Sequence, residues 1–443
     1  MGKHLKVVLF PIDAVGHVNS ATGIAQVLLE AGHRVIFIIS EQWRGKLCKY
    51  GIEELILDEG DKKPTGAEDS SNSGGGADDA ALQWANLMKQ TDTFTNLDPL
   101  VRLVNVRKHL YMSEMKRLET VNQSIERLLR DLRPDIVLTD QFMTVPAIMT
   151  SGIPWIWWCS PNPLVFIDDD RTPPGCSGLP TTGPKSEWQS FRNVVNEASL
   201  ESWTYWNSYC MGQGCQPLDK YRYQHFSPYL NIYGFPLELD YLDIRPLPDK
   251  WLRFDNLKRQ EVNTGPKFEI PESLLGKPGK LVYFSLGSMG GADVDLMKRL
   301  VGILAKSRNR FIVSKGPGDR LYDLPDNMWG RRSVPQIQVL PVVDLVITHG
   351  GNNTVTETLY FGKPMLVLPL WGDQWDNGQR IAEKGLGLSL NAHKCTEDEL
   401  IKAVDSLLED SLLEKRLAKI AQRIQSDNSI GKLPEIIENL LDK

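Results

Sequence analysis

Short runs of apolar, mostly β-branched residues recur along the chain and alternate with longer segments of helical periodicity. Near the N-terminus an apolar run at 5–10 is followed by a helical pattern at 19–31 and a second apolar run at 34–39. Two such runs joined by a helix form a parallel β-α-β unit with a right-handed crossover. Further runs at 136–138 and 155–158 extend the same sheet. The N-terminal half therefore predicts a doubly wound α/β domain.

The same alternation restarts in the C-terminal half. Apolar runs at 281–284, 310–313, 345–347 and 365–368 are separated by helical or turn segments. They predict a second parallel α/β sheet with helices on its faces. Residues 397–443 carry helical patterns with interleaved charge, which is typical of surface helices.

Two segments between the periodic regions lack the apolar content of a core. Residues 246–275 combine prolines with charged residues and predict a linker. The chain therefore divides into an N-terminal domain at 1–245 and a second domain at 276–425. Residues 59–82 are rich in Gly, Ser, Asp and Lys, and they predict a mobile surface loop because they cannot bury enough apolar surface to order themselves.

Composition and charge narrow the class of partner. The 443 residues are 41% hydrophobic and carry a formal net charge of -6, so there is no basic footprint for nucleic acid or an anionic membrane surface. No run of 18 or more apolar residues predicts a membrane span. A strand begins almost at once, which leaves no room for a signal peptide, and the six cysteines include no CxxC pair. We therefore expect a cytoplasmic monomer with reduced thiols that binds small molecules.

The segment from His349 to Thr354 offers groups for binding a nucleotide. Its glycines lie between the apolar run at 345–347 and a helical pattern at 355–361. The first amides of a helix lack internal partners and attract anions, and glycines allow a diphosphate to approach the backbone. Glu357, one turn further along, can accept hydrogen bonds from both hydroxyls of a ribose.

These residues belong to a longer pattern that resembles a known family. With the turns at Gly16-His17-Val18-Asn19 and Ser285-Leu286-Gly287-Ser288, they resemble family 1 UDP-glycosyltransferases over most of the chain. The donor signature of that family is matched by Pro335-Gln336, His349-Gly350-Gly351-Asn352-Asn353-Thr354, Glu357, Pro364, Pro369 and Asp373-Gln374.

The resemblance implies an α/β protein of the GT-B fold, in which two doubly wound, Rossmann-like domains face each other across a cleft. It also implies that the last helix, at 426–443, crosses back to the N-terminal domain. The expected lack of a signal peptide and a membrane anchor is similar to soluble plant, bacterial and arthropod (mite-type) members rather than to most animal members.

The resemblance also implies a set of donor-binding residues. One departure is Ser333, which stands where the family usually has an aromatic ring stacked on uracil, so we expect either Trp329 or the Val334 backbone with Gln336 to hold the base. Read from spacing alone, a histidine at a strand end such as His349 is more often a packed or capped residue, and Asn353 can be a helix cap. The implied donor-binding residues are Gly16, Ser288, Val334, Gln336, His349, Gly351, Asn352, Asn353, Thr354, Glu357, Asp373 and Gln374.

The resemblance assigns the catalytic base to His17 and its orienting acid to Asp140. An imidazole can take a proton near neutral pH, and a bonded carboxylate fixes its tautomer. We expect no cofactor and no metal, because helix-start amides stabilise the leaving UDP. The acidic run at 168–170 contains a DxD pattern, but three adjacent acids usually form a solvated turn.

An aromatic-rich set of residues in the N-terminal half predicts the acceptor site. An apolar, ring-lined cavity favours flat lipophilic acceptors such as flavonoids, other phenols or xenobiotics, which would suit a role in detoxification. The alternative for these rings is core packing. The predicted acceptor-binding residues are Met143, Trp155, Trp158, Ser160, Trp203 and Trp206.

The sequence thus predicts an inverting transferase that moves a hexose, with UDP-glucose as the expected donor because the family often pairs Asp-Gln with glucose. A UDP-sugar epimerase of the same fold and a sugar-nucleotide-binding protein without turnover are the alternatives. A nicotinamide dehydrogenase is excluded because the first β-α-β unit lacks GxGxxG.

Overall fold

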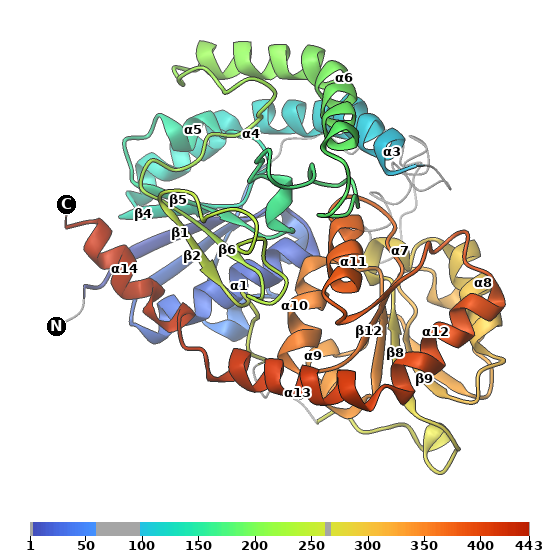
Figure 1. The fold of residues 1–443 in the computed structure, drawn as a ribbon. Coiled ribbons are helices and arrows are strands. Elements are labelled where there is room, and N and C mark those ends of the chain that lie inside the picture. Colours follow the sequence, from blue (N-terminus) through green and yellow to red (C-terminus); the bar gives the residue numbers. More distant parts are fainter. Residues whose placement is uncertain (1–2, 59–97, 262–266, 443) are drawn as a thin grey trace.

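Two parallel β-sheets with helices on both faces make up the protein. The computed structural model describes residues 3–58, 98–261 and 267–442, and the predicted loop at 59–82 lies outside them. The two sheets lie side by side. The chain completes the N-terminal sheet before it enters the C-terminal one, and only its C-terminal end returns to the N-terminal domain (Figure 1). This confirms the predicted pair of doubly wound α/β domains.

The N-terminal sheet has seven strands in the order β3-β2-β1-β4-β5-β6-β7, and every neighbouring pair is parallel. Its strands are β1 (Lys6–Phe10), β2 (Arg34–Ile39), β3 (Glu53–Ile56), β4 (Ile136–Thr139), β5 (Trp155–Cys159), β6 (Leu230–Gly234) and β7 (Trp251–Phe254). Its helices are α1 (Val15–Glu30), α3 (Pro99–Asn105), α4 (Tyr111–Leu132), α5 (Pro146–Met149) and α6 (Lys185–Gly212).

Side chains of the central strand β1 alternate between two apolar layers. Val7 and Leu9 pack on the face covered by α1, whereas Val8 and Phe10 pack with residues of α4, α5 and α6. Both layers are apolar because a parallel strand in the middle of a sheet is buried on both faces. The buried β1 and β4 fix the positions of the loops that leave their carboxyl ends.

The C-terminal sheet has six strands in the order β10-β9-β8-β11-β12-β13, again all parallel. The strands are β8 (Leu281–Ser285), β9 (Arg310–Ser314), β10 (Met328–Arg331), β11 (Leu345–Thr348), β12 (Met365–Val367) and β13 (Gly387–Ser389). The helices around it are α7 (Gly287–Gly290), α8 (Val294–Leu304), α9 (Gln336–Val339), α10 (Asn352–Tyr360), α11 (Gln374–Glu383) and α12 (Glu397–Glu409).

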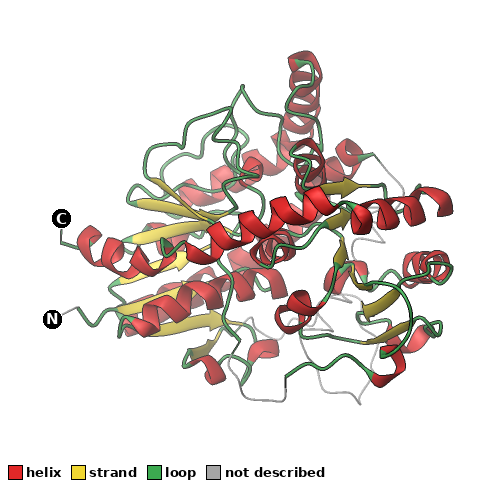
Figure 2. Cartoon of the chain, turned by 60° about the horizontal axis from the view of Figure 1, so that its bottom comes forward, coloured by secondary structure: helices red, strands yellow, loops and turns green. Residues whose placement is uncertain are grey.

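The chain ends on the N-terminal domain. Helix α13 (Ser411–Ser426) runs past both sheets, and α14 (Leu433–Leu440) packs on α1 through Leu433 and Ile437. Figure 2 shows the two termini at the same end of the molecule, where Lys3 forms an ion pair with Asp442. Among the described helices, none is long and apolar enough to cross a membrane.

The structure differs from the sequence-based predictions in three places. Helix α1 begins at Val15 rather than at residue 19, so His17 lies in its first turn. Part of the predicted linker at 246–275 is not a linker, because β7 lies within it and pairs with β6. The predictions also missed β3, β6, β10 and β13. Most of these strands lie at or next to sheet edges, are short and carry Gly or polar residues, so they lack a continuous apolar run.

Each sheet has one point at which its strand order reverses. In the N-terminal sheet this point lies between β1 and β4, and in the C-terminal sheet it lies between β8 and β11. Ligands of open α/β sheets bind outside the carboxyl ends of the strands at such points. The segments that follow these four strands contain His17, Asp140, Ser288 and His349, and they lie where the two domains touch.

Candidate active site

The His17 ring and the Asp140 carboxylate come together beside the first topological switch point. Asp140 directly follows β4, and His17 lies in the first turn of α1 after β1. The Nδ1 atom of His17 is 2.6 Å from Oδ2 of Asp140, and the carboxylate is fully buried while the imidazole is partly exposed. The other carboxylate oxygen accepts a hydrogen bond of 2.7 Å from the backbone N–H of Ile12. This arrangement holds the carboxylate rigidly against the ring.

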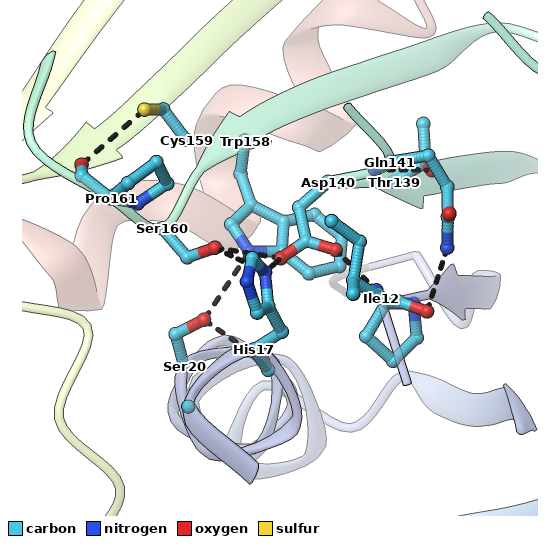
Figure 3. Close-up of polar contacts among 12 residues, drawn as sticks. Ile12, His17, Ser20, Thr139, Asp140, Gln141, Trp158, Cys159, Ser160 and Pro161 are labelled. Atoms are coloured by element: carbon cyan, nitrogen blue, oxygen red, sulfur yellow. Dashed lines mark hydrogen bonds and ion pairs between the residues drawn. The ribbon is translucent and has the colours of Figure 1, made fainter. Parts of the chain in front are cut away.

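Ser160 completes a three-membered polar cluster with these residues. Its hydroxyl lies 2.7 Å from Nδ1 of His17 and donates to Oδ2 of Asp140 at 2.8 Å. Figure 3 shows both side chains pointing at the imidazole. An ionised carboxylate only accepts hydrogen bonds, so Nδ1 carries the ring proton, and Nε2 of the neutral ring is left as the proton acceptor. Ser160, which the sequence suggested as an acceptor contact, therefore lies within the base cluster.

The structure does not gather the predicted acceptor residues in one place. Met143, Trp155 and Trp206 are buried in the layer between the sheet and helices α4 to α6. Trp158 is buried on the opposite face, where its indole lies 3.4 Å from the Ser20 hydroxyl of α1. Trp203 donates its indole N–H to the backbone of Asp219. Side chains on opposite faces of a sheet cannot line one pocket, so core packing accounts for most of this set.

A ring that the sequence analysis missed lies against the imidazole instead. Phe142 contacts His17 edge to face, with ring centroids 5.3 Å apart. Phe166 packs on Phe142 at 5.3 Å, and Trp157 packs on Phe166 at 4.6 Å. Phe142 follows Asp140 by two positions, so the strand-end position of Asp140 was the available signal for it.

On the other side of the domain boundary, His349 holds two glycine turns together. A Cβ atom at Gly287 would lie 2.7 Å from Cε1 of His349, and one at Gly351 would lie 2.5 Å from its Nε2. Glycine is therefore needed at both positions, and at Gly287 also because φ is +72°. Burial lowers the pKa of His349 to about 4, so the ring is neutral at pH 7. Ser288 is the residue after Gly287 and lies in α7.

Helix α10 begins in the turn after His349 and points its first residues at the N-terminal domain. Its N-cap is Gly351, which has no side chain to cap the first amides of the helix. Its first amides can therefore bind an anion. The side-chain amide of Asn353 donates to the backbone oxygen of Gly16 at 2.6 Å, and that of Asn352 donates to the backbone oxygen of Ser160 at 2.8 Å.

Glu357 and Gln336 form a polar pair beneath this helix start. The Gln336 amide donates to Oε2 of Glu357 at 2.5 Å and to the hydroxyl of Thr354 at 3.3 Å. Burial raises the pKa of Glu357, and the nearby cations Arg259 and Lys258 oppose that shift. These donor-site predictions thus converge on one cluster.

The region where we expected the uracil base contains few aromatic contacts. Val334 is buried and Ser333 is exposed. Trp329 lies in the edge strand β10, where its ring packs at 6.1 Å from that of Phe268. Trp329 is thus separated from β8 by β9, and both Trp329 and the neighbouring Val334 with Gln336 remain predictions for holding the base.

Asp373 and Gln374 lie at the start of α11, next to the base cluster. Oδ2 of Asp373 accepts a hydrogen bond of 2.9 Å from the backbone N–H of Asn162. Burial raises the pKa of Asp373 to about 6, while that hydrogen bond and the neighbouring His17 oppose the shift. The side-chain oxygen of Gln374 accepts from the backbone of Leu370 and Trp371 at 3.0 and 3.1 Å, so its amide N–H groups are the part available to a sugar.

Two of the three acids in the run at 168–170 form ion pairs with arginines. Asp168 pairs with Arg192 at 3.0 Å, and Asp169 pairs with Arg171 at 2.6 Å. Hydrogen bonding to Arg171 lowers the pKa of Asp169 to about 2. Over the described ranges, no group of three or more His, Cys, Asp or Glu side chains is placed to hold a metal ion.

Comparisons with known proteins identify relatives of this chain. Residues 273–434 match the family described as UDP-glucoronosyl and UDP-glucosyl transferase. The NDP-glycosyltransferase YjiC of Bacillus subtilis (strain 168) is 22% identical over 448 aligned positions, covering 100% of this chain and 98% of that protein.

Two solved structures show the same fold at low identity. The glycotransferase of kitacinnamycin has a TM-score of 0.66 at 18% identity and covers 99% of this chain and 100% of that one. The spinosyn rhamnosyltransferase SpnG has a TM-score of 0.65 at 18% identity, covering 98% and 100%. These likenesses confirm the predicted GT-B arrangement of the two domains.

Proposed function

Because this chain belongs to the UDP-glycosyltransferase family, we propose that it transfers a hexose from a UDP-sugar to a hydroxyl group of a small lipophilic acceptor, with inversion at the anomeric carbon. One observation carries the proposal. The turn that bears His17, paired with Asp140, touches the glycine-rich donor segment of the other domain, because the Asn353 side chain donates to the backbone oxygen of Gly16 at 2.6 Å. Base and donor loop are thus adjacent.

The proposed reaction is a single displacement. The acceptor oxygen forms a bond to the anomeric carbon, and the bond from that carbon to the β-phosphate oxygen breaks, so that UDP leaves with the electron pair. His17 Nε2 takes the acceptor proton, and Asp140 stabilises the imidazolium. Attack from the face opposite UDP converts an α-linked donor into a β-glycoside. The amides at the start of α10, together with neutral His349, donate to the leaving diphosphate.

Contacts within the donor half support the assignment of sugar and ribose roles. Glu357, with Gln336 beside it, is suited to the ribose diol because a carboxylate accepts two hydrogen bonds at once. Asp373 lies close enough to His17 for the histidine to lower the pKa of the Asp373 carboxyl. A sugar bound by Asp373 would therefore lie beside the base. We propose glucose as the sugar on the Asp-Gln pair, although one structural neighbour is named a rhamnosyltransferase.

The rings next to the imidazole support an apolar, aromatic acceptor. Phe142 and Phe166 offer ring edges and faces beside His17, and flat rings stack well against such surfaces. Flavonoids, other phenols and xenobiotics therefore remain our predicted acceptors, with detoxification in the cytoplasm as the predicted role. Since Asp168 and Asp169 of the acidic run are paired with arginines, we predict that a chelator leaves the rate unchanged.

A donor and acceptor panel tests the proposal. UDP-glucose, UDP-glucuronate, UDP-N-acetylglucosamine and TDP-rhamnose are each incubated with a mixed phenol panel, and products are identified by mass spectrometry. We expect glucosides, and UDP release that depends on the added phenol. A different preferred sugar would overturn the choice of glucose. Sugar isomerisation without an acceptor would favour the epimerase, and nucleotide binding without any product would favour a non-catalytic protein.

A further inference from the structure

We propose that Ser160 is a positioning residue for the base, and that Asn352 of the donor loop holds Ser160 in place. The inference rests on the proposed function, since it assigns roles within the same reaction. The sequence predicts acceptor binding for Ser160 and diphosphate binding for Asn352. We assign both residues instead to positioning the base. The base would then be aligned only when the two domains meet.

The Ser160 hydroxyl is well placed to fix the imidazole. It is 2.7 Å from Nδ1 of His17 and 2.8 Å from Oδ2 of Asp140, and Figure 3 shows the three groups as one cluster. The hydroxyl can accept from the ring N–H while donating its own proton to the carboxylate. Two partners on Nδ1 restrict rotation of the ring, and so they fix the direction in which Nε2 points.

Asn352, which belongs to the other domain, donates a hydrogen bond to the backbone of the same serine. Its amide nitrogen is 2.8 Å from the backbone oxygen of Ser160 and 3.1 Å from that of Gly234. Ser160 follows β5 and Gly234 ends β6, which are neighbouring strands. Both facing atoms are carbonyl oxygens, so the amide nitrogen must point toward them and both of its hydrogens are used. The buried Asn352 amide therefore has no N–H left to donate to a diphosphate.

A second set of contacts ties the same segment to the donor loops. Asn162, two residues after Ser160, donates its backbone N–H to Asp373 at 2.9 Å and its side-chain amide to Asn377 at 2.8 Å. The Asn377 amide in turn donates to the backbone oxygen of Gly350 at 2.8 Å. Residues 160–162 are thus held by the start of α10 and by the start of α11. A donor that orders these two helix starts would also order the support of His17.

The alternative is that these hydrogen bonds only hold the domains together. Kinetics separate the two cases. Loss of a purely adhesive contact would weaken donor binding and thermal stability together, because the donor site needs both loops. Loss of a positioning contact lowers kcat for protein that still binds UDP, since the base is misaligned in the bound state.

The test compares Ser160→Ala and Asn352→Ala with the wild-type enzyme, using the best donor and phenol from the panel. For both variants we expect kcat to fall about tenfold or more, which is a part of the roughly 10²- to 10⁴-fold that general-base catalysis supplies. We expect the Kd for UDP measured by calorimetry to stay within about twofold of the wild-type value. Ser160→Thr keeps a hydroxyl and is expected to retain most of the rate. The double variant should be no slower than about the slower single variant, because both act through one chain of contacts.

Thr181→Val is the matched control. It removes an interdomain hydrogen bond of 2.9 Å to Glu383 that does not involve the base cluster, so kcat should be unchanged. Wild-type kcat in Ser160→Ala would overturn the inference, as would a raised donor KM and UDP Kd with unchanged kcat in Asn352→Ala. Equal loss in Thr181→Val would show that closure alone matters. A wild-type enzyme that transfers no sugar would instead overturn the proposed function.

Discussion

The Nδ1 atom of His17 lies 2.6 Å from Oδ2 of Asp140, although the two residues are 123 positions apart in the sequence. The pairing follows from strand order, because β1 and β4 are neighbours and their carboxyl ends reach the same edge of the sheet. Because the pairing uses Nδ1, Nε2 of the imidazole is left to take a proton.

Replacing Asp140 by Asn tests the role of the carboxylate. An amide of the same shape can leave the ring in place, but it removes the charge that stabilises an imidazolium. We expect kcat to fall by about 10² to 10⁴, with UDP affinity unchanged. Steady-state kinetics and calorimetry measure the two quantities. A rate within threefold of wild type would show that the carboxylate is structural.

Replacing Gly287 by Ala tests whether the His349 ring must lie where it does. The added Cβ would approach Cε1 of His349 to 2.7 Å, so the ring has to move and we expect the Kd for UDP to rise about tenfold. Gly45→Ala is the control, because its φ of +76° matches the +72° of Gly287 but nothing lies within 4 Å. Both variants should lose stability because both place an alanine at positive φ, and Gly287→Ala should lose more because the buried ring must also move. Equal UDP affinity in the two would contradict a donor role for His349.

Because the carboxyl group of Asp376 is buried, we expect it to make the stability of the protein depend on pH. It is buried in α11 and accepts backbone hydrogen bonds from Cys176 and Gly178 at 2.6 and 2.9 Å. Burial raises its pKa to about 7, against about 3.9 in an unfolded chain. The folded protein therefore binds more protons between about pH 4 and pH 7, and this contribution to stability is lost as the pH rises through that window.

Asp376→Asn should remove this dependence, which amounts to roughly 1.4 kcal/mol for each unit of pKa difference. We expect the Tm of the wild type to fall more between pH 5 and pH 8 than that of the variant. Glu126→Gln, at an exposed carboxylate of α4, is the control and should follow the wild type. Parallel curves for all three proteins would contradict the assignment to Asp376.

Ion pairs of Arg423 hold α13 against the N-terminal domain, and their contribution to stability can be measured. Its guanidinium pairs with Glu238 at 2.6 Å and with the buried Asp255 at 2.7 Å. Arg423→Met should lower the free energy of unfolding by about 1 to 3 kcal/mol, because it leaves a buried carboxylate with one partner fewer. The control is Arg308→Met, whose partners are more exposed, and it should cost less than about 1 kcal/mol. Urea unfolding that ranks the two in reverse order would contradict this.

The sequence predicts the buried strands and the glycine turns well, for a physical reason. The four central strands β1, β4, β8 and β11 are buried on both faces, so each is a continuous apolar run. The donor turn is visible because glycines with special contacts, such as Gly351, cannot be replaced without a clash. Edge strands such as β7 escaped prediction because only part of their surface is buried.

Side-chain partners across the domain boundary could not be predicted in this way. The contact of Asn352 with Ser160 spans 192 positions, and no spacing within either segment indicates it. The tryptophans of the acceptor prediction do not come together for a related reason, since an aromatic residue on a central strand fits a packed core as well as a pocket. The face on which Trp158 lies depends on the strand register, which composition does not reveal.

Acceptor-dependent release of UDP by the His17→Asn variant tests the central claim most directly. Asparagine keeps a polar side chain of similar reach but cannot act as a base near neutral pH. The account predicts that wild-type protein releases UDP only when a phenol is added and forms a β-glycoside, whereas the variant binds UDP with unchanged affinity and turns over about 10² to 10⁴ times more slowly. Equal turnover by the two proteins would contradict it.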